Sequence, residues 1–323
     1  MKLAKLTLCA LVALALSLSA LAFAEDAHYP VTITTYDYAK TPVEITFNEK
    51  PTRAISGQEI WNEMMFYFDL DEYMVAIANS DSNVPEEYKE RYDALPKISD
   101  SWHNKEGIVS LEPQVFFGWR SHFAEDSLGD IYEWIDRDIQ PVVLNCSNNA
   151  CGNPSVQAVL QDFDNLGKIF DIQDKTDAYI AEANAMLDSI QENVAQLEAP
   201  KTVLMLEYYD GDTTVYAWGT NSLSGQMITN AGAVNPIDMQ GDISLEEIVA
   251  INPDKIILMN AGNSDTEEDR ESIYNAFYAL EGLRSVEAVK NEQVRIYPLD
   301  DIYGGGIRII PAIEDIYNWI YAE

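Results

Sequence analysis

Two glutamates in a repeated phrase are the first residues with a recognisable chemical role. Ile108–Gly118 reads Ile-Val-Ser-Leu-Glu-Pro-Gln-Val-Phe-Phe-Gly, and Ile243–Leu258 begins Ile-Ser-Leu-Glu-Glu and also ends in an apolar strand. We expect each phrase to begin with a helical turn, and a glutamate at a helix start is favoured by the helix dipole. That effect alone would explain Glu112 or Glu246. The duplication further predicts two similar lobes, each presenting one carboxylate, with a ligand cleft between them.

A second set of residues could hold a large, flat ligand. Ligands of open α/β sheets bind beyond the carboxyl ends of the strands, where Trp and Tyr would offer flat, half-polar walls. Arginine there could pair with a carboxylate or stack on a ring. Ordinary packing, or pairing of an arginine with a nearby acid, is the alternative for each residue. The residues expected at the ligand site are Trp102, His103, Trp119, Arg120, Tyr208, Trp218, Tyr303 and Arg308.

Other chemistry has little support in the sequence. His103 and His122 could ligate a haem iron, but the chain has only 3 His, which disfavours a zinc or manganese site. Gly304–Gly306 lacks the lysine of a phosphate loop and is expected to be a flexible turn. No serine lies in a nucleophile elbow. We therefore expect no catalytic residues, no bound metal and no intrinsic cofactor.

The cysteines bear on the compartment. Cys146 and Cys151 flank Ser-Asn-Asn-Ala in a polar stretch. In an exported protein a disulfide between them is expected. A metal site is the alternative, although two thiols with no histidine nearby make a poor zinc set.

The first residues predict export. Lys2 and Lys5 precede the uncharged apolar run Leu6–Leu21, and Ala-Phe-Ala ends at Ala24. This is the pattern of a signal peptide cleaved after Ala24, with a membrane anchor as the alternative. The net charge of −34 disfavours nucleic acid as a partner. We expect a periplasmic protein, or one at the extracellular face of a one-membrane cell.

Strands and helices alternate along the rest of the chain. Residues 31–47 predict a hairpin, and short apolar strands then alternate with helices, which indicates an α/β fold with doubly wound parallel sheets. Heptad-like apolar spacing predicts a long helix between residues 174 and 197. The predicted organisation is a signal peptide at 1–24, a lobe at 25–172, a connecting helix at 173–199 and a second lobe at 200–323.

The order of several phrases resembles the substrate-binding proteins of ABC importers for ferric siderophores, haem and cobalamin. Beside the two Ser-Leu-Glu phrases, these are Pro51–Ile55, Leu166–Phe170, Asn230–Asn235 and Val286–Tyr297. The resemblance implies two α/β lobes joined by one rigid helix, with the ligand between them and modest closure. It also implies that Glu112 and Glu246 meet arginines of the two permease subunits.

The expected function is capture of an iron–siderophore complex and its delivery to an ABC permease dimer by a monomeric protein. Cobalamin and haem are the alternative ligands, in that order. A secreted α/β hydrolase working through paired carboxylates is the alternative from another class, and a cell-surface receptor on the same scaffold is a further one. Substitution of Glu112 and Glu246 would distinguish transport from the others.

Overall fold

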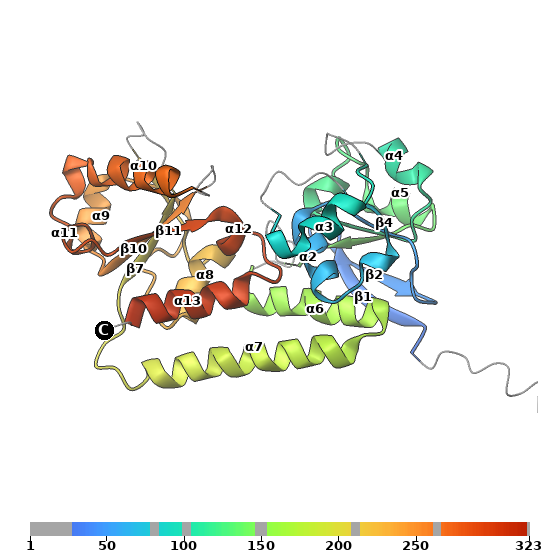
Figure 1. Cartoon of the computed structure of the whole chain (residues 1–323), viewed down its shortest axis with the longest axis horizontal. Helices are drawn as coiled ribbons and strands as arrows, with labels where there is room; N and C mark the ends of the chain where they lie inside the picture. Colours follow the sequence, from blue (N-terminus) through green and yellow to red (C-terminus); the bar gives the residue numbers. More distant parts are fainter. Residues whose placement is uncertain are drawn as a thin grey trace, which may run out of the picture.

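The chain folds into two α/β lobes that lie side by side over one long helix (Figure 1). The computed structural model describes residues 28–77, 84–98, 105–145, 154–207, 214–260 and 266–321. The long helix is α7 (Gln173–Val194), and its 22 residues correspond to about 33 Å. The predicted fold class, two α/β lobes joined by one long helix, is confirmed. The predicted signal peptide lies outside the described residues.

The first lobe is built on a parallel sheet with the strand order β4-β3-β5-β6. Its strands are buried along almost their whole length, as expected for a sheet covered on both faces. The elements of this lobe are β3 (Ala54–Ser56), α2 (Glu59–Tyr67), η1 (Asp71–Tyr73), β4 (Met74–Ile77), α3 (Glu86–Ala94), α4 (Lys105–Ser110), β5 (Val115–Gly118), η2 (Arg120–Phe123), α5 (Ile131–Ile135), β6 (Gln140–Val143) and α6 (Val156–Phe170).

The predicted N-terminal hairpin is present as β1 (Val31–Tyr36) and β2 (Pro42–Phe47), which pair antiparallel. Alternate residues of β2 are buried, because one face of the hairpin packs on the lobe and the other faces solvent. The buried Thr35 hydroxyl accepts a hydrogen bond from the Val143 amide at 2.9 Å. This bond fixes the hairpin beside β6.

The second lobe has the strand order β11-β10-β7-β8-β9. Its elements are β7 (Val203–Glu207), β8 (Val215–Ala217), α8 (Leu223–Asn230), β9 (Gly241–Ile243), α9 (Leu245–Ile251), β10 (Lys255–Asn260), α10 (Glu267–Tyr278), η4 (Glu281–Leu283), α11 (Glu287–Lys290), β11 (Val294–Pro298), α12 (Leu299–Ile302) and α13 (Ile309–Tyr321).

This second sheet is only partly parallel. β11, β10 and β7 run parallel, whereas β8 pairs antiparallel with β7 and β9 antiparallel with β8. The expectation of parallel strands throughout was therefore wrong for β8 and β9. The seven residues between β7 and β8 are too few for a parallel crossover, which needs about a dozen or more.

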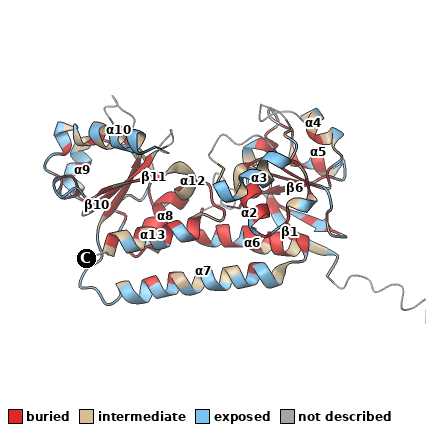
Figure 2. Ribbon diagram, viewed as in Figure 1, coloured by how far each residue is buried: buried red, intermediate tan, exposed pale blue. Residues whose placement is uncertain are grey.

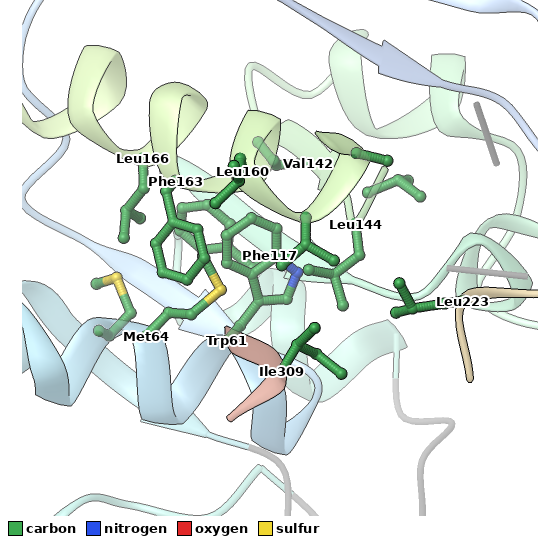
Figure 3. Close-up of a cluster of buried hydrophobic side chains, with 14 of the residues drawn as sticks. Trp61, Met64, Phe117, Val142, Leu144, Leu160, Phe163, Leu166, Leu223 and Ile309 are labelled. Carbon is green, nitrogen blue, oxygen red and sulfur yellow. The ribbon is translucent and has the colours of Figure 1, made fainter. Parts of the chain in front are cut away.

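The apolar core is continuous between the lobes. Trp61 and Leu144 of the first lobe lie in one buried cluster with Leu223 and Ile309 of the second (Figure 3). Successive β7 residues point to opposite faces of the sheet, so Met205 joins this shared cluster whereas Leu204 belongs to a separate cluster on the other face. One face of the second sheet is thus part of the core of the first lobe.

α6 and α7 form the base on which both lobes rest. α6 is capped by Ser155, which accepts from the Ala158 amide, and it ends at the left-handed Asp171. α7 is mostly exposed and buries a narrow stripe of side chains (Figure 2). Near its end, the side-chain Nε2 of Gln191 donates to the Asn230 carbonyl of the second lobe at 3.1 Å. Across the described residues, every helix is too short or too polar to span a bilayer.

Candidate functional site

A cleft lies between the lobes at the carboxyl ends of strands, as expected for α/β sheets. We call it the interlobe cleft, and its volume is about 520 Å³, within the range of small-molecule sites. Its described lining residues are Lys40, Trp119, Arg120, Pro154, Tyr216, Trp218, Ser222, Leu223, Ser224, Gln240, Tyr303 and Gly304. Four residues predicted for the ligand site, Trp119, Arg120, Trp218 and Tyr303, are among them.

Aromatic rings form a continuous row across this cleft. The ring of Tyr303 lies 6.4 Å from that of Trp119 and 5.6 Å from that of Trp218, and Tyr216 lies 5.2 Å from Trp218. Trp119 belongs to the first lobe and the other three rings to the second. All four are half-buried, with their faces neither lost in the core nor fully exposed. The ring planes are tilted by 37° between Trp119 and Tyr303, by 64° between Tyr303 and Trp218 and by 66° between Trp218 and Tyr216, so both lobes offer aromatic faces and edges to the cleft.

Trp119 follows β5 directly, and local packing fixes its position. Its amide donates to Nδ1 of His122 at 3.1 Å, and a Cβ at Gly118 would lie 2.7 Å from the same nitrogen. Glycine is therefore needed where the strand turns into η2. His122 is buried within the first lobe, with its Nδ1 already accepting this bond. His122 is not among the cleft lining, which disfavours the idea that it ligates a haem iron.

Two cations line the first-lobe side of the cleft, and the hairpin positions both. Arg120 donates to the Tyr38 carbonyl at 2.7 Å, and its guanidinium lies 4.8 Å from the centre of the Tyr38 ring. Lys40 occupies the turn of the hairpin in a left-handed conformation, with φ of 70°. No Asp or Glu is among the described lining residues. The described lining therefore carries two cations, in a chain whose net charge is −34.

Trp218 follows β8 and is anchored through its backbone. Its amide donates to the Met205 carbonyl at 2.9 Å, and its carbonyl accepts from the Asn235 side chain at 2.8 Å. Within the described residues, Trp218 Nε1 and Gln240 Oε1 are buried without a hydrogen-bond partner. A buried polar atom without a partner costs about 1–3 kcal/mol, so a ligand that bonds to these two atoms would recover that loss.

The Gly304–Gly306 turn forms a close contact between the lobes. All three glycines have positive φ, at 83°, 102° and 77°. A Cβ at Gly304 would lie 2.6 Å from Ile60 Cδ1 and 3.0 Å from Trp119 Cη2. The expected turn is present, but glycine is required here for close approach to α2 as well as for backbone conformation.

Arg308 lies outside the interlobe cleft and pairs with acids. Its Nε donates to Glu63 Oε2 at 2.8 Å and its Nη1 to Asp301 at 3.2 Å, and its Nη2 also bonds to Glu63. The Glu63 side chain is 9% exposed and that of Arg308 is 21% exposed. The structure thus gives Arg308 the alternative role considered from the sequence, pairing with acids, and this pair joins α2 to the second lobe.

Burial is the main influence on the pKa of Glu63 in this ion pair. Loss of water around Glu63 raises the pKa of its carboxyl above the ordinary value, and the hydrogen bond from Arg308 only partly offsets this. The charges of Asp300 and Asp301 raise the same pKa further. Burial is therefore the main cause of the raised pKa of Glu63, and Arg308 opposes it.

The expectation that both repeated glutamates begin a helix was wrong for Glu112. Glu246 lies in the first turn of α9, but Glu112 follows the end of α4 and has φ of 47°. Its counterpart is Asn252, which follows α9 with φ of 49°. The residue equivalent to Glu246 is Glu106, in the first turn of α4. Each lies seven residues before a proline, Pro113 or Pro253.

Hydrogen bonds support this corrected register. The Gln114 side chain accepts from the Arg53 amide at 3.1 Å, and the Asp254 side chain accepts from the Thr202 amide at 2.8 Å. Gln114 after α4 and Asp254 after α9 thus occupy equivalent positions, each directly following the proline. The sequence feature that identifies Glu106 as the counterpart of Glu246 is the equal spacing from the following proline. The shared Ser-Leu-Glu sequence indicated the wrong counterpart, Glu112.

Some predicted residues cannot be placed. Trp102, His103, Tyr208, Cys146 and Cys151 lie outside the described residues. Among the residues that are described, no group of three or more His, Cys, Asp and Glu is arranged to hold a metal ion. Three further lining residues were not predicted from the sequence. Lys40, Tyr216 and Gln240 reach the cleft from a hairpin turn, a short strand and a loop without a distinctive motif.

Comparison with known proteins gives a consistent picture. A family model described as periplasmic binding protein matches residues 58–300. No curated protein matches the chain in sequence. Among solved structures, a periplasmic binding protein from Veillonella parvula DSM 2008 is 24% identical with a TM-score of 0.82, over 91% of this chain and 92% of that one.

Other similar structures are of proteins whose names state the ligand that they bind. The periplasmic haem-binding protein HutB of Vibrio cholerae is 20% identical with a TM-score of 0.67, over 84% of this chain and 99% of that one. The catecholate-siderophore binding protein VctP of Vibrio cholerae is 18% identical with a TM-score of 0.67, over 91% of this chain and 100% of that one. At these identities the likeness shows a shared fold.

Proposed function

Because the chain belongs to the periplasmic binding protein family, we propose that it captures a ferric siderophore outside the cytoplasm and delivers it to an ABC permease. The family consists of solute-binding proteins, so the chain is a binding protein and not an enzyme. The observation that carries the ligand proposal is the aromatic row of the interlobe cleft together with its two cations. Haem- and siderophore-binding proteins share the fold.

The charge of the cleft favours an anionic chelate. Lys40 and Arg120 both line the cleft, and the carbonyl and ring of Tyr38 hold Arg120 at the hairpin. Arginine can pair with oxyanions and stack on rings, and the aromatic row suits a ligand with planar groups. Cobalamin would gain from the rings but less from the cations. Haem would gain from both, but no histidine is among the described lining residues to ligate its iron.

The ligand is tested by fluorescence titration of the purified protein. The probes are a ferric tris-catecholate, ferrioxamine B, haemin and cyanocobalamin. We expect quenching of tryptophan fluorescence, with the tightest binding for the anionic ferric tris-catecholate, weaker binding of the cationic ferrioxamine B, and a large loss in Trp218→Ala. Trp319→Phe is a matched control because Trp319 lies in α13, outside the cleft lining. Tightest binding of haemin or cyanocobalamin, or equal affinity of both variants, would contradict the ligand proposal.

For the permease, we propose contacts from Glu106 and Glu246. Both are exposed and lie in the first turns of equivalent helices, α4 and α9, at opposite ends of the molecule (Figure 1). Two separated carboxylates on one rigid body suit two arginine pockets on a permease dimer. Each exposed pair would contribute about 0–1 kcal/mol, so the pairs orient the protein more than they anchor it.

Docking is tested by uptake of the labelled chelate in cells. We expect Glu106→Gln combined with Glu246→Gln to reduce uptake while ligand affinity in solution is unchanged. Glu112→Gln is the matched control, since Glu112 is exposed and near α4 but follows its end. Equal loss in the control, or normal uptake in the double variant, would contradict this docking.

A further inference from the structure

A second cavity lies between the lobes, beyond the Gly304–Gly306 turn. Its volume is about 470 Å³. Its described lining residues are Glu63, Tyr67, Pro85, Glu87, Tyr88, Tyr297, Asp301, Ile307, Arg308, Pro311, Ala312 and Asp315. We call it the second cavity. It shares no described lining residue with the interlobe cleft, and the chain passes from one to the other between Gly304 and Ile307.

Both lobes build the walls of the second cavity. α2 and α3 contribute Glu63, Tyr67 and Tyr88 from the first lobe, and α12 and α13 contribute Asp301 and Asp315 from the second. Figure 1 shows α2 and α12 facing one another across the junction. The Glu63–Arg308 ion pair crosses between the lobes at this wall. A molecule bound here would therefore contact both lobes.

The charges of this cavity do not cancel. Arg308 pairs with both Glu63 and Asp301, so one guanidinium serves two carboxylates. Asp315 pairs with Arg295 at 2.7 Å. Glu87 is exposed and has no ion pair or hydrogen bond among the described residues. The lining therefore keeps a negative excess, which attracts a positively charged guest.

Tyr67 and Tyr88 supply accessible aromatic faces, whereas Tyr297 is buried and the Arg295 guanidinium already lies 4.8 Å from the centre of its ring. Burial and the nearby Glu87 raise the pKa of Tyr88 to about 12, so its ring stays un-ionised at neutral pH. Burial, and then the hydrogen bond that Tyr297 donates to Asp315 at 2.6 Å, raise the pKa of Tyr297 as well. Neutral aromatic faces beside carboxylates are the surroundings that bind organic ammonium groups by cation–π attraction.

We propose that the second cavity is a binding site for an organic cation, a primary ammonium or guanidinium on an apolar body. Its charged head would lie near Glu87 and the tyrosine rings, and its apolar part against Ile307, Pro311 and Ala312. Size, charge and aromatic lining all fit this class of ligand. An anionic chelate bound in the interlobe cleft would be excluded from the second cavity by charge.

The site is tested with three probes of similar shape and different charge. Benzylamine is cationic at neutral pH, benzyl alcohol is neutral and benzoate is anionic. Ligand-observed NMR on the full mature protein should show saturable binding of benzylamine with a Kd of the order of 1 mM, as a small probe allows. Benzyl alcohol should bind at least about 3-fold more weakly, and benzoate should not bind.

Variants locate the binding. Glu87→Gln and Tyr88→Leu should each weaken benzylamine about 2- to 5-fold. Trp218→Ala, in the interlobe cleft, should leave benzylamine affinity unchanged. Circular dichroism melts of each variant check that folding is retained, and Glu87 is exposed enough to be replaced without disturbing the core. Equal binding of the three probes, absence of saturable binding, or loss only in Trp218→Ala would overturn the proposal.

Discussion

The interlobe cleft and the second cavity share their architecture but have opposite charge. Both lie between the lobes and both have aromatic walls. Among the described lining residues, the cleft presents Lys40 and Arg120, whereas the cavity presents four acids and one arginine. Net charge therefore does not determine which charges line a site: in a chain of charge −34, the hairpin turn brings Lys40 to the cleft and Tyr38 holds Arg120 there.

The two regions also use arginine differently. Arg120 is held by a backbone carbonyl and a ring at the hairpin, so its charge is not neutralised by the Tyr38 contacts. Arg308 is paired with two carboxylates and ties the lobes together. The first arrangement suits recognition of an anion, and the second suits attachment of one lobe to the other. Substitutions at each arginine would separate these roles.

The largest effect is expected from Arg308→Met. Removing the guanidinium leaves the Glu63 carboxylate buried without its partner, so we expect a loss of about 3–5 kcal/mol in the free energy of unfolding. Urea denaturation measures it. Arg284→Met is the control, because the Arg284 side chain is 67% exposed and its pair with Glu281 should contribute about 1 kcal/mol or less. Similar losses in the two variants would remove the distinction between attachment and surface pairing.

A smaller effect is expected from Gly304→Ala. The added methyl would meet Ile60 and Trp119, and the residue would have to keep a positive φ. We expect a loss of about 1–3 kcal/mol in unfolding free energy, together with weaker ligand binding because Trp119 must shift. Gly241→Ala is the control, since nothing lies within 4 Å of its Cβ position. Unchanged stability in Gly304→Ala would mean that the turn can move away from α2.

Next comes Arg120→Gln, which tests the charge of the interlobe cleft. We expect affinity for an anionic chelate to fall by about 1 kcal/mol, and benzylamine binding in the second cavity to remain as in wild type. Titrations at low and high salt measure both. Arg137→Gln, on an exposed ion pair with Glu133, is the control. If the salt dependence of chelate binding does not change in Arg120→Gln, the cations do not act on the ligand.

The smallest effect is the pH response of Glu63. Its pKa is raised in the folded protein, so its contribution to stability is full below about pH 4.5 and is lost as the pH rises through the raised pKa. Wild type should therefore lose unfolding free energy relative to Glu63→Gln as the pH rises from about 4.5. Denaturation of both proteins at several pH values measures this difference. A difference that moves in the opposite direction would show that Arg308 outweighs burial.

The sequence predicted the parts of the site that follow strands. Trp119 and Trp218 come directly after β5 and β8, and the aromatic residue after a buried strand is exposed to the cleft by the fold itself. Lys40 and Gln240 escaped prediction because their places depend on where a hairpin turn and a loop lie in space. The destination of Arg308 also depends on a tertiary partner, Glu63, which is 245 residues away in the chain.

The fold was predictable where local pattern decides it. The alternation of apolar and polar residues predicted the hairpin of β1 and β2. Apolar residues at spacings of three and four predicted α7. The antiparallel direction of β8 was predicted wrongly, because a short apolar strand has the same pattern in either direction, and β9 (Gly241–Ile243) has no apolar pattern that would predict a strand. The two repeated segments were aligned wrongly because the alignment was based on the shared Ser-Leu-Glu sequence. The correct alignment superimposes Pro113 on Pro253, which follow the left-handed residues Glu112 and Asn252.

The apolar cluster shared by Trp61, Leu144, Leu223 and Ile309 limits how this molecule can be engineered. A chimera that joins one half of this chain to the other half of a relative would cut through that cluster and mismatch its side chains on both sides. Interchange of ligand specificity between relatives is therefore better sought by grafting hairpin and loop residues than by swapping halves. Because the same cluster joins the cores of the two lobes, neither lobe is suited to a sensor whose two parts must separate freely.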